Sequence, residues 1–177
     1  GMTVYELTFG MDHVLTEMTE FKDVLSFEGH SMRVSGDNGL RYRAGINTSS
    51  KNQLKTTGVN GYTLNECGIV GMTTKNYENY PLIIGGEKTA TSKSYYYVSS
   101  NRIKDVIVGS DDTKDYFSAF YADMPVKVYE VPMITRSYIK VVKAGKTYTI
   151  YSAPARKDMY SLAKQVKDAE LSAERTP

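Results

Sequence analysis

The chain has 177 residues, which is enough for one well-buried core and short for two, so we expect a single domain. Its 22 Lys and Arg against 20 Asp and Glu give a net charge of +2, spread along the chain, which argues against general nucleic-acid binding. No apolar run approaches the roughly 20 residues that cross a bilayer, and the single cysteine excludes an internal disulfide and a thiolate zinc site.

The composition favours β-structure. There are 15 Tyr against 5 Phe and no Trp, and many Ser and Thr accompany them. Such residues suit pleated strands that have one face in water. We therefore predict a mainly β protein, an antiparallel β-sandwich-like domain with an N-terminal and a C-terminal helix. The expected parts are a strand and helix over 1–25, a β core over 26–153 and a helix over 154–172.

The N-terminal segment begins with a weak alternation over 2–9 that predicts a strand. Apolar residues then recur at helical spacing and predict a helix over 11–23 whose apolar stripe faces the core. The stripe consists of Met11, Val14, Leu15, Met18, Phe21 and Leu25.

The segment 31–46 reads SMRVSGDNGLRYRAGI and predicts a hairpin. A two-residue turn would place apolar and charged side chains on one face, so we favour a three-residue loop over 37–39 with Gly39 in the left-handed conformation of a bulge. This register pairs Val34 with Tyr42 and Met32 with Ala44.

Three arginines flank the loop of this hairpin: Arg33, Arg41 and Arg43. The hairpin places them on the face opposite the apolar one. Exposed charge on a strand face is common, so solvation and local salt bridges are favoured over a dedicated anion site. They remain candidate ligand-binding residues.

The segment 137–152 predicts a second hairpin around a two-residue turn, Ala144-Gly145. A longer loop that starts at Lys143 stays open, because Ala is not preferred in such a turn. The pairs are Ile139 with Ile150 and Val141 with Tyr148 on a core face, and Tyr138 with Tyr151 and Lys140 with Thr149 on the other.

Short strands are expected between and after these hairpins, separated by Gly, Asn, Asp and Ser. A short helix is the alternative over 102–107. A stripe from Met159 to Ala169 predicts a helix over 156–171, with Pro154 near its start. The strand candidates are 62–73, 81–84, 94–99, 106–108, 116–121 and 126–131.

Catalytic and metal motifs are weak. Ser161-x-x-Lys164 matches a serine–lysine pattern, but its second motif precedes it and no Lys-Thr-Gly strand follows. His13 and His30 are the only histidines and form no metal motif. We expect no cofactor and no metal, with one open question. The loop with Asp111, Asp112 and Asp115 could hold calcium, although a solvated turn is favoured.

A run of tyrosines points to carbohydrate. Exposed aromatic rings with a hydroxyl at the rim can stack against pyranose rings. We therefore ask whether a flat exposed tyrosine platform forms; cross-strand tyrosine pairing on a sheet face is the favoured alternative. The candidates are Tyr95, Tyr96, Tyr97, Tyr138 and Tyr151.

With the hairpins placed, Gly29 to Ala163 resembles an uncharacterised module of secreted and surface proteins of Gram-positive, often gut-dwelling, bacteria. The resemblance rests on the GHSMR, GLRY, ITRSYI and YTIYS segments and the closing helix. His30 and Ser137 stand where alanine is usual. The resemblance implies an extracellular β-sandwich-like module beside other domains, and arginines at 33, 41 and 136 that anchor strand edges or loops.

Together these observations predict a non-catalytic extracellular module for adhesion, spacing or presentation. Because Gly1 before Met2 resembles the residue that tag cleavage leaves, we expect a signal peptide to have been removed. The expected partners are a polysaccharide or a host or cell-wall protein, without nucleic acid or membrane insertion. A tyrosine-based carbohydrate-binding module is the alternative, and a serine–lysine hydrolase is third.

Overall fold

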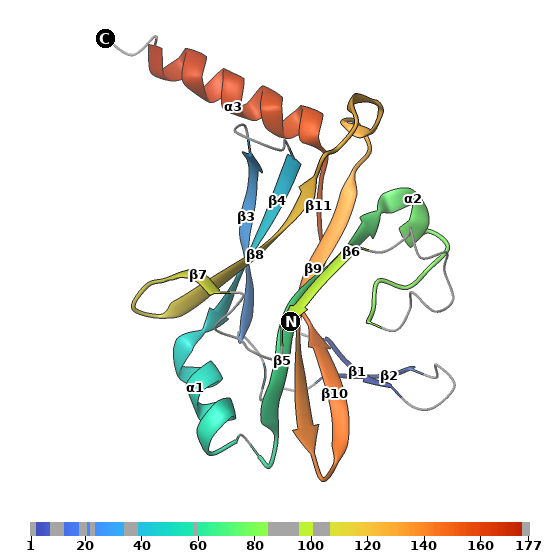
Figure 1. Ribbon diagram of the computed structural model, residues 1–177, viewed down its shortest axis with the longest axis vertical. Coiled ribbons are helices and arrows are strands. Elements are labelled where there is room, and N and C mark those ends of the chain that lie inside the picture. The colour runs from blue at the N-terminus through green and yellow to red at the C-terminus, as the bar shows by residue number, and fades with distance from the viewer. Residues whose placement is uncertain are drawn as a thin grey trace.

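The structure is a computed structural model that describes residues 3–7, 13–17, 21, 24–33, 39–58, 60–84, 96–100 and 107–174. For β1, β2, β6, Arg33, 107–108 and 170–174 the backbone alone is described. The predicted mainly β fold is confirmed, because these residues form two antiparallel sheets (Figure 1).

Sheet A has seven strands in the order β2-β1-β10-β9-β5-β6, and β11 pairs with the start of β9. Sheet B has four strands in the order β3-β4-β8-β7. The bounds of sheet A are β1 Thr3–Leu7, β2 His13–Glu17, β5 Thr63–Thr73, β6 Tyr96–Ser100, β9 Met133–Lys143, β10 Lys146–Tyr151 and β11 Ala155–Lys157. Those of sheet B are β3 Leu25–Arg33, β4 Gly39–Asn47, β7 Ile107–Ser110 and β8 Lys114–Ala122.

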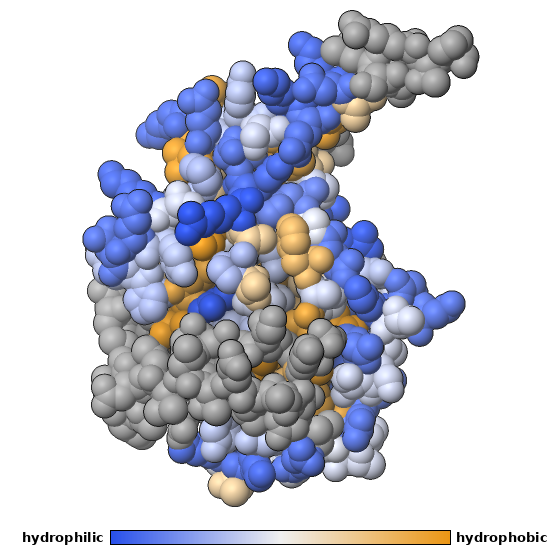
Figure 2. Space-filling view, turned by 180° about the vertical axis from the view of Figure 1, so that it is seen from behind, coloured by the Kyte–Doolittle hydropathy of each residue, from blue (hydrophilic) through white to orange (hydrophobic). Residues whose placement is uncertain are grey.

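The helical elements are α1 Thr48–Thr56, α2 Thr74–Tyr77, the 3-10 helix η5 Val126–Val128 and α3 Met159–Glu174. The C-terminal segment forms α3, which projects beyond the two sheets, and the described part of its surface is largely hydrophilic (Figures 1 and 2). Asp158 caps it by accepting a 2.7 Å hydrogen bond from the Ser161 amide. Among the described residues no helix has the length and apolar character needed to span a membrane.

The second hairpin has the register that the sequence predicts. Ile139 lies opposite Ile150, and Tyr138 opposite Tyr151. The turn is the short one, because Lys143 pairs with Lys146, and Ala144 and Gly145 both have positive φ, 51° and 75°. That pair of angles matches the right-handed twist of the flanking strands, so the turn places Ala144 in a left-handed conformation that is unfavourable for Ala, and Gly145 takes the second position without strain.

The first hairpin has the predicted faces but not the predicted register. Met32 lies opposite Leu40, and His30 opposite Tyr42, so the connection is longer than three residues. The shift is an even number of residues, which leaves every side chain of β4 on the face that alternation assigned to it. The register also shifts between Phe27 and His30, where β3 has an irregularity.

Three other predictions are wrong. The segment 13–17 is strand β2, paired with β1, rather than part of a helix. Its apolar spacing was short enough to fit either period, and pairing along the edge of sheet A decided the outcome. The segment 81–84 has no regular structure, and 126–128 is a 3-10 turn that follows Pro125.

The core lies between the two sheets. Alternate side chains of β4 and β9 meet there, among them Tyr42, Ile46 and Ile139, all fully buried. Leu54 of α1 and Phe21 close one end, and the Phe21 ring meets the Tyr62 ring edge-on with 5.4 Å between centroids. The sandwich therefore has two outer faces, and these faces differ.

A strap formed by residues 80–84 covers the outer face of sheet A. Leu82 and Ile83 of the strap are buried against Val70, Met72 and Ile134. The outer face of sheet B carries charged and aromatic side chains. Two of its arginines, Arg41 and Arg43, are exposed.

Candidate functional site

The tyrosine platform is contradicted at two of its five residues. Tyr138 and Tyr151 lie side by side on sheet A, with 6.1 Å between ring centroids, but both are 0% exposed beneath the strap. The Tyr138 hydroxyl donates a 2.6 Å hydrogen bond to Glu66, and the Tyr151 hydroxyl accepts one of 2.7 Å from the Ile84 amide. Apolar strap residues cover these rings, so they serve packing and cannot stack against a sugar.

Arg136 belongs to the same buried cluster. Its guanidinium lies 4.0 Å from the centre of the Tyr151 ring and donates to the carbonyl oxygen of Leu82 in the strap. Its side chain therefore fastens the strap to β9.

For the other predicted tyrosines and for Arg33, the structure describes the backbone alone or nothing. Tyr95 lies outside the described residues. Tyr96 and Tyr97 are in β6, at the edge of sheet A, and pair with Gly71 and Val70. Arg33 ends β3 opposite Gly39. For these three strand residues the backbone alone is described, so their part in ligand binding stays a prediction.

Arg41 and Arg43 lie on the outer face of sheet B, at alternate positions of β4. The Arg43 guanidinium lies 4.0 Å from the centre of the Tyr116 ring on the neighbouring β8. Arg41 is exposed and stands between Ser31 and Phe120 in the register. Within the described part of the chain no hydrogen bond, ion pair or ring contact of Arg41 is found. The predicted solvation fits Arg41, while Arg43 is held by an aromatic ring.

Phe120 completes this face. It is half-buried and lies directly opposite Arg41, with the edge of its ring over Gly39. A Cβ atom on Gly39 would overlap the Tyr121 carbonyl oxygen and reach 3.0 Å from Phe120 Cε2. Glycine is therefore required for β4 and β8 to approach here and for the ring to lie over the strand. We call Arg41, Arg43, Tyr116 and Phe120 the outer arginine–aromatic face.

Ion pairs border this face. Lys114 donates a 2.6 Å hydrogen bond to Glu28 across the sheet, and Lys51 of α1 pairs with the buried Asp115 of β8. Burial raises the pKa of both carboxyl groups, but hydrogen bonds from the lysines and from Ser26 and Ser110 outweigh it and lower both. These carboxylates thus stay ionised at neutral pH and tie α1 and β3 to β8.

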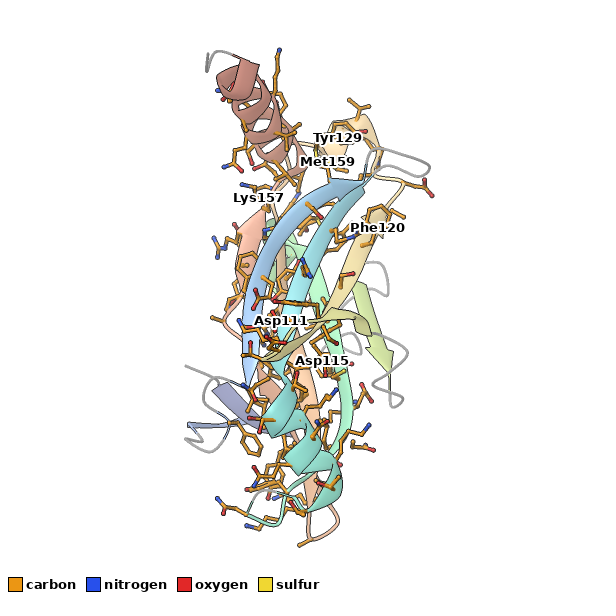
Figure 3. All side chains as sticks on the ribbon, turned by 90° about the vertical axis from the view of Figure 1, so that its left-hand side faces the viewer. Asp111, Asp115, Phe120, Tyr129, Lys157 and Met159 are labelled. Carbon is orange, nitrogen blue, oxygen red and sulfur yellow. The ribbon has the colours of Figure 1, made fainter. Side chains whose placement is uncertain are left out.

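The acidic loop is a turn. Asp111 Oδ1 accepts hydrogen bonds of 2.8 Å from the amides of Thr113 and Lys114, and its other oxygen accepts from the Tyr116 hydroxyl. These hydrogen bonds, with that from Tyr116 the largest effect, lower the pKa of Asp111. The carboxylate of Asp115 instead forms an ion pair with Lys51 and accepts a hydrogen bond from the Ser110 hydroxyl. Figure 3 shows Asp111 and Asp115 above α1. The turn that the sequence favours is confirmed, and within the described ranges no group of three metal-ligating side chains converges.

The two remaining reactive side chains are held in place. The Ser161 hydroxyl donates a 2.7 Å hydrogen bond to Asp158 at the start of α3, while Lys164 is exposed one turn further on. Cys67 is buried in the core, and burial, with a contribution from Glu66, raises the pKa of its thiol to about 12. The lowered pKa of Asp158 makes its carboxylate a poor base for Ser161, and among the described residues no base is found that would activate the buried Cys67 thiol.

His30 predicts a pH dependence of stability. Burial, together with the charge of Lys157, lowers its pKa from 6.5 to about 4; its ring lies 4.9 Å from that of Phe27 and 5.7 Å from that of Tyr42. Between pH 6.5 and about 4, His30 is protonated in the unfolded chain but neutral in the folded protein. The free energy of unfolding therefore decreases as the pH falls from 6.5 towards 4. We expect about 1–2 kcal/mol, allowing for partial screening by water.

Urea unfolding at pH 7, 6, 5 and 4.5 measures this dependence. In His30→Gln the loss over that range should nearly vanish, because Gln does not titrate. The carboxyl groups of lowered pKa contribute mainly below about pH 5, and they add the same loss to both proteins. An equal slope in both proteins would contradict the assignment to His30.

Sequence reasoning missed Tyr116 and Phe120 as surface residues, since 116–121 was interpreted only as a strand. Period-two alternation from Lys114 assigns both to the outer face, so the signal was present. Comparison with protein-family models, curated proteins and solved structures found no significant match to this chain.

Proposed function

We propose that this protein is a non-catalytic adhesion module of a secreted or surface-exposed bacterial protein, and that it binds its ligand through the outer arginine–aromatic face. The observation that carries the proposal is the solvent-facing pair of arginines, Arg41 and Arg43, next to the rings of Phe120 and Tyr116 on adjoining strands. The bacterial and extracellular setting is part of this proposal and rests on the resemblance of the GHSMR, GLRY, ITRSYI and YTIYS segments described above.

The use of polar groups elsewhere supports a non-catalytic role. Glu66, Glu28 and Asp115 each accept hydrogen bonds from neighbouring side chains that hold elements together. A general acid or base needs a carboxyl group that faces the substrate with a pKa near the working pH. The lowered pKa values of Glu28 and Asp115 favour permanent ionisation instead.

The chemistry of the face favours an acidic polysaccharide. A guanidinium offers a planar fork of donors that fits a carboxylate or sulfate, and an aromatic ring offers a flat surface for a pyranose. Arg41 and Phe120 present both at adjacent positions in the register. The carbohydrate alternative therefore moves from the buried tyrosines of sheet A to sheet B. A pure spacer would need no such exposed set.

Titration calorimetry with acidic polysaccharides and with neutral ones of similar linkage tests the proposal. We expect saturable binding to an acidic polymer, and a loss of about fivefold or more in affinity for each of Arg41→Ala and Arg43→Ala, as for a solvent-exposed charged contact. Arg156→Ala is the matched control, because it removes an exposed arginine that stacks, at 5.8 Å, on Tyr77 away from this face.

The outcomes separate the alternatives. Equal loss in all three variants would show unspecific charge attraction and overturn the assignment of the face. Absence of binding to every polymer would overturn adhesion to carbohydrate and favour spacing or presentation. Binding to neutral polymers that survives in both arginine variants would return attention to the tyrosines of β6.

A further inference from the structure

A separate pocket lies beyond the end of β8, at the end of the molecule where α3 begins. Its volume is about 270 Å³, and its walls come from the end of β5, the end of β8, the 123–125 connection, η5 and the start of β9. Figure 3 shows Phe120 and Tyr129 near this end, with Met159 at the start of α3. The main wall residues are Phe120, Tyr121, Asp123, Met124, Val128 and Met133.

The walls suit an apolar body of about one ring. Met124 and Met133 bring polarisable thioethers, which adapt in shape and contact aromatic rings favourably, and Phe120 adds a ring of its own. A cavity of about 150 Å³ lined by apolar side chains can hold benzene. The pocket therefore has room for one ring and a short chain.

The pocket carries a single charged side chain among its lining residues, Asp123. This residue is exposed at the rim and has a left-handed backbone, with φ of 51°. Asp is one of the few non-glycine residues that tolerate that conformation. The Tyr121 hydroxyl faces inward and is hydrogen bonded to Thr135 in the core. The carboxylate of Asp123 at the mouth of the pocket is therefore complementary to a cation.

We infer that this pocket binds a small amine with an aromatic or branched apolar body. The apolar body lies between Met124, Met133 and Phe120, and the ammonium group pairs with the carboxylate of Asp123 at the rim. This inference goes beyond the adhesion role, because the pocket takes a small cation whereas the outer arginine–aromatic face takes an anion. Phe120 stands between the two and is shared by both.

The test uses the whole chain with ¹³C-labelled methionine methyl groups, titrated with 2-phenylethylamine and with its neutral counterpart 2-phenylethanol. We expect the methyl signals of Met124 and Met133 to shift in a saturable way, with that of Met72, buried beneath the strap, unchanged. The amine should bind about fivefold more tightly than the alcohol, the difference expected for an exposed ion pair.

Asp123→Asn is the sharp variant, because Asn also tolerates the left-handed conformation and changes only the charge. It should bind the alcohol as before and lose the preference for the amine. Signals of Met124 and Met133 that do not move at millimolar ligand would overturn the inference. So would equal affinity for both ligands in the unaltered protein, or a preference for the amine that persists in Asp123→Asn.

Discussion

Replacing Arg136 by Ala is expected to lower the free energy of unfolding by about 2–4 kcal/mol, a large effect for one side chain. The substitution removes a buried guanidinium that stacks at 4.0 Å on Tyr151 and donates to the Leu82 carbonyl. The Leu82 carbonyl then loses its charged donor, and the strap loses its attachment to β9. Both losses exceed the gain from no longer burying a cation.

Urea unfolding together with amide hydrogen exchange measures this prediction. Amides of residues 82–84 should exchange faster in Arg136→Ala, whereas those of β4 should change only with global stability. Arg156→Ala is the control, since this exposed arginine also lies over a tyrosine, Tyr77, at 5.8 Å and should cost less than about 0.5 kcal/mol. A similar decrease in the free energy of unfolding in both variants would show that the burial of Arg136 does not account for its contribution to stability.

Gly39→Ala is expected to destabilise the protein by about 1–3 kcal/mol, because the added methyl group would overlap the Tyr121 carbonyl oxygen on β8. A backbone oxygen cannot rotate away as a side chain can, so β4 and β8 must separate. The same change displaces the Phe120 ring, which makes it a test of both stability and binding.

Gly109→Ala supplies the comparison. A Cβ atom at Gly109 meets nothing within 4 Å, and this variant should unfold at nearly the same urea concentration as the unaltered protein. Thermal and urea unfolding of both variants decide the matter. If Gly39→Ala were as stable as Gly109→Ala, the close approach of β4 to β8 would be wrong, and with it the placement of Phe120.

The clearest sequence signals were alternation and turn chemistry acting together. In 137–152 both pointed to one register, and the structure has it. In 31–46 alternation assigned the faces of β4 correctly, but turn chemistry chose a loop that is too short. The face of a strand depends on its own residues, whereas the register depends on where the partner strand begins, which is a tertiary property.

Two segments, one a strand and one a helix, show the opposite limits of helical periodicity as a signal. The stripe around Val14 fitted a helix, yet the segment pairs with β1 as strand β2. Helix α1 was not predicted at all, because Leu54 is its single buried side chain and it shows no apolar stripe. What specifies α1 is its cap, in which Asn47 accepts a 2.9 Å hydrogen bond from the Ser50 amide.

The candidate site was predictable in part. Arg41 and Arg43 were identified from the hairpin, and the aromatic residues beside them follow the alternation of β8. The burial of Tyr138 and Tyr151 was not predictable, because it depends on a strap from a distant part of the chain. The alternation of residues along a strand does not distinguish a solvent-exposed outer face from one that another segment of the chain covers.

The most direct measurement is a map of amide and arginine side-chain chemical shifts while an acidic oligosaccharide is added to the labelled protein. The adhesion account predicts saturable changes on the outer face of sheet B, at Arg41, Arg43, Ser118 and Phe120, with the strap over sheet A unaffected. Changes confined to sheet A, or no complex with any acidic saccharide, would contradict it.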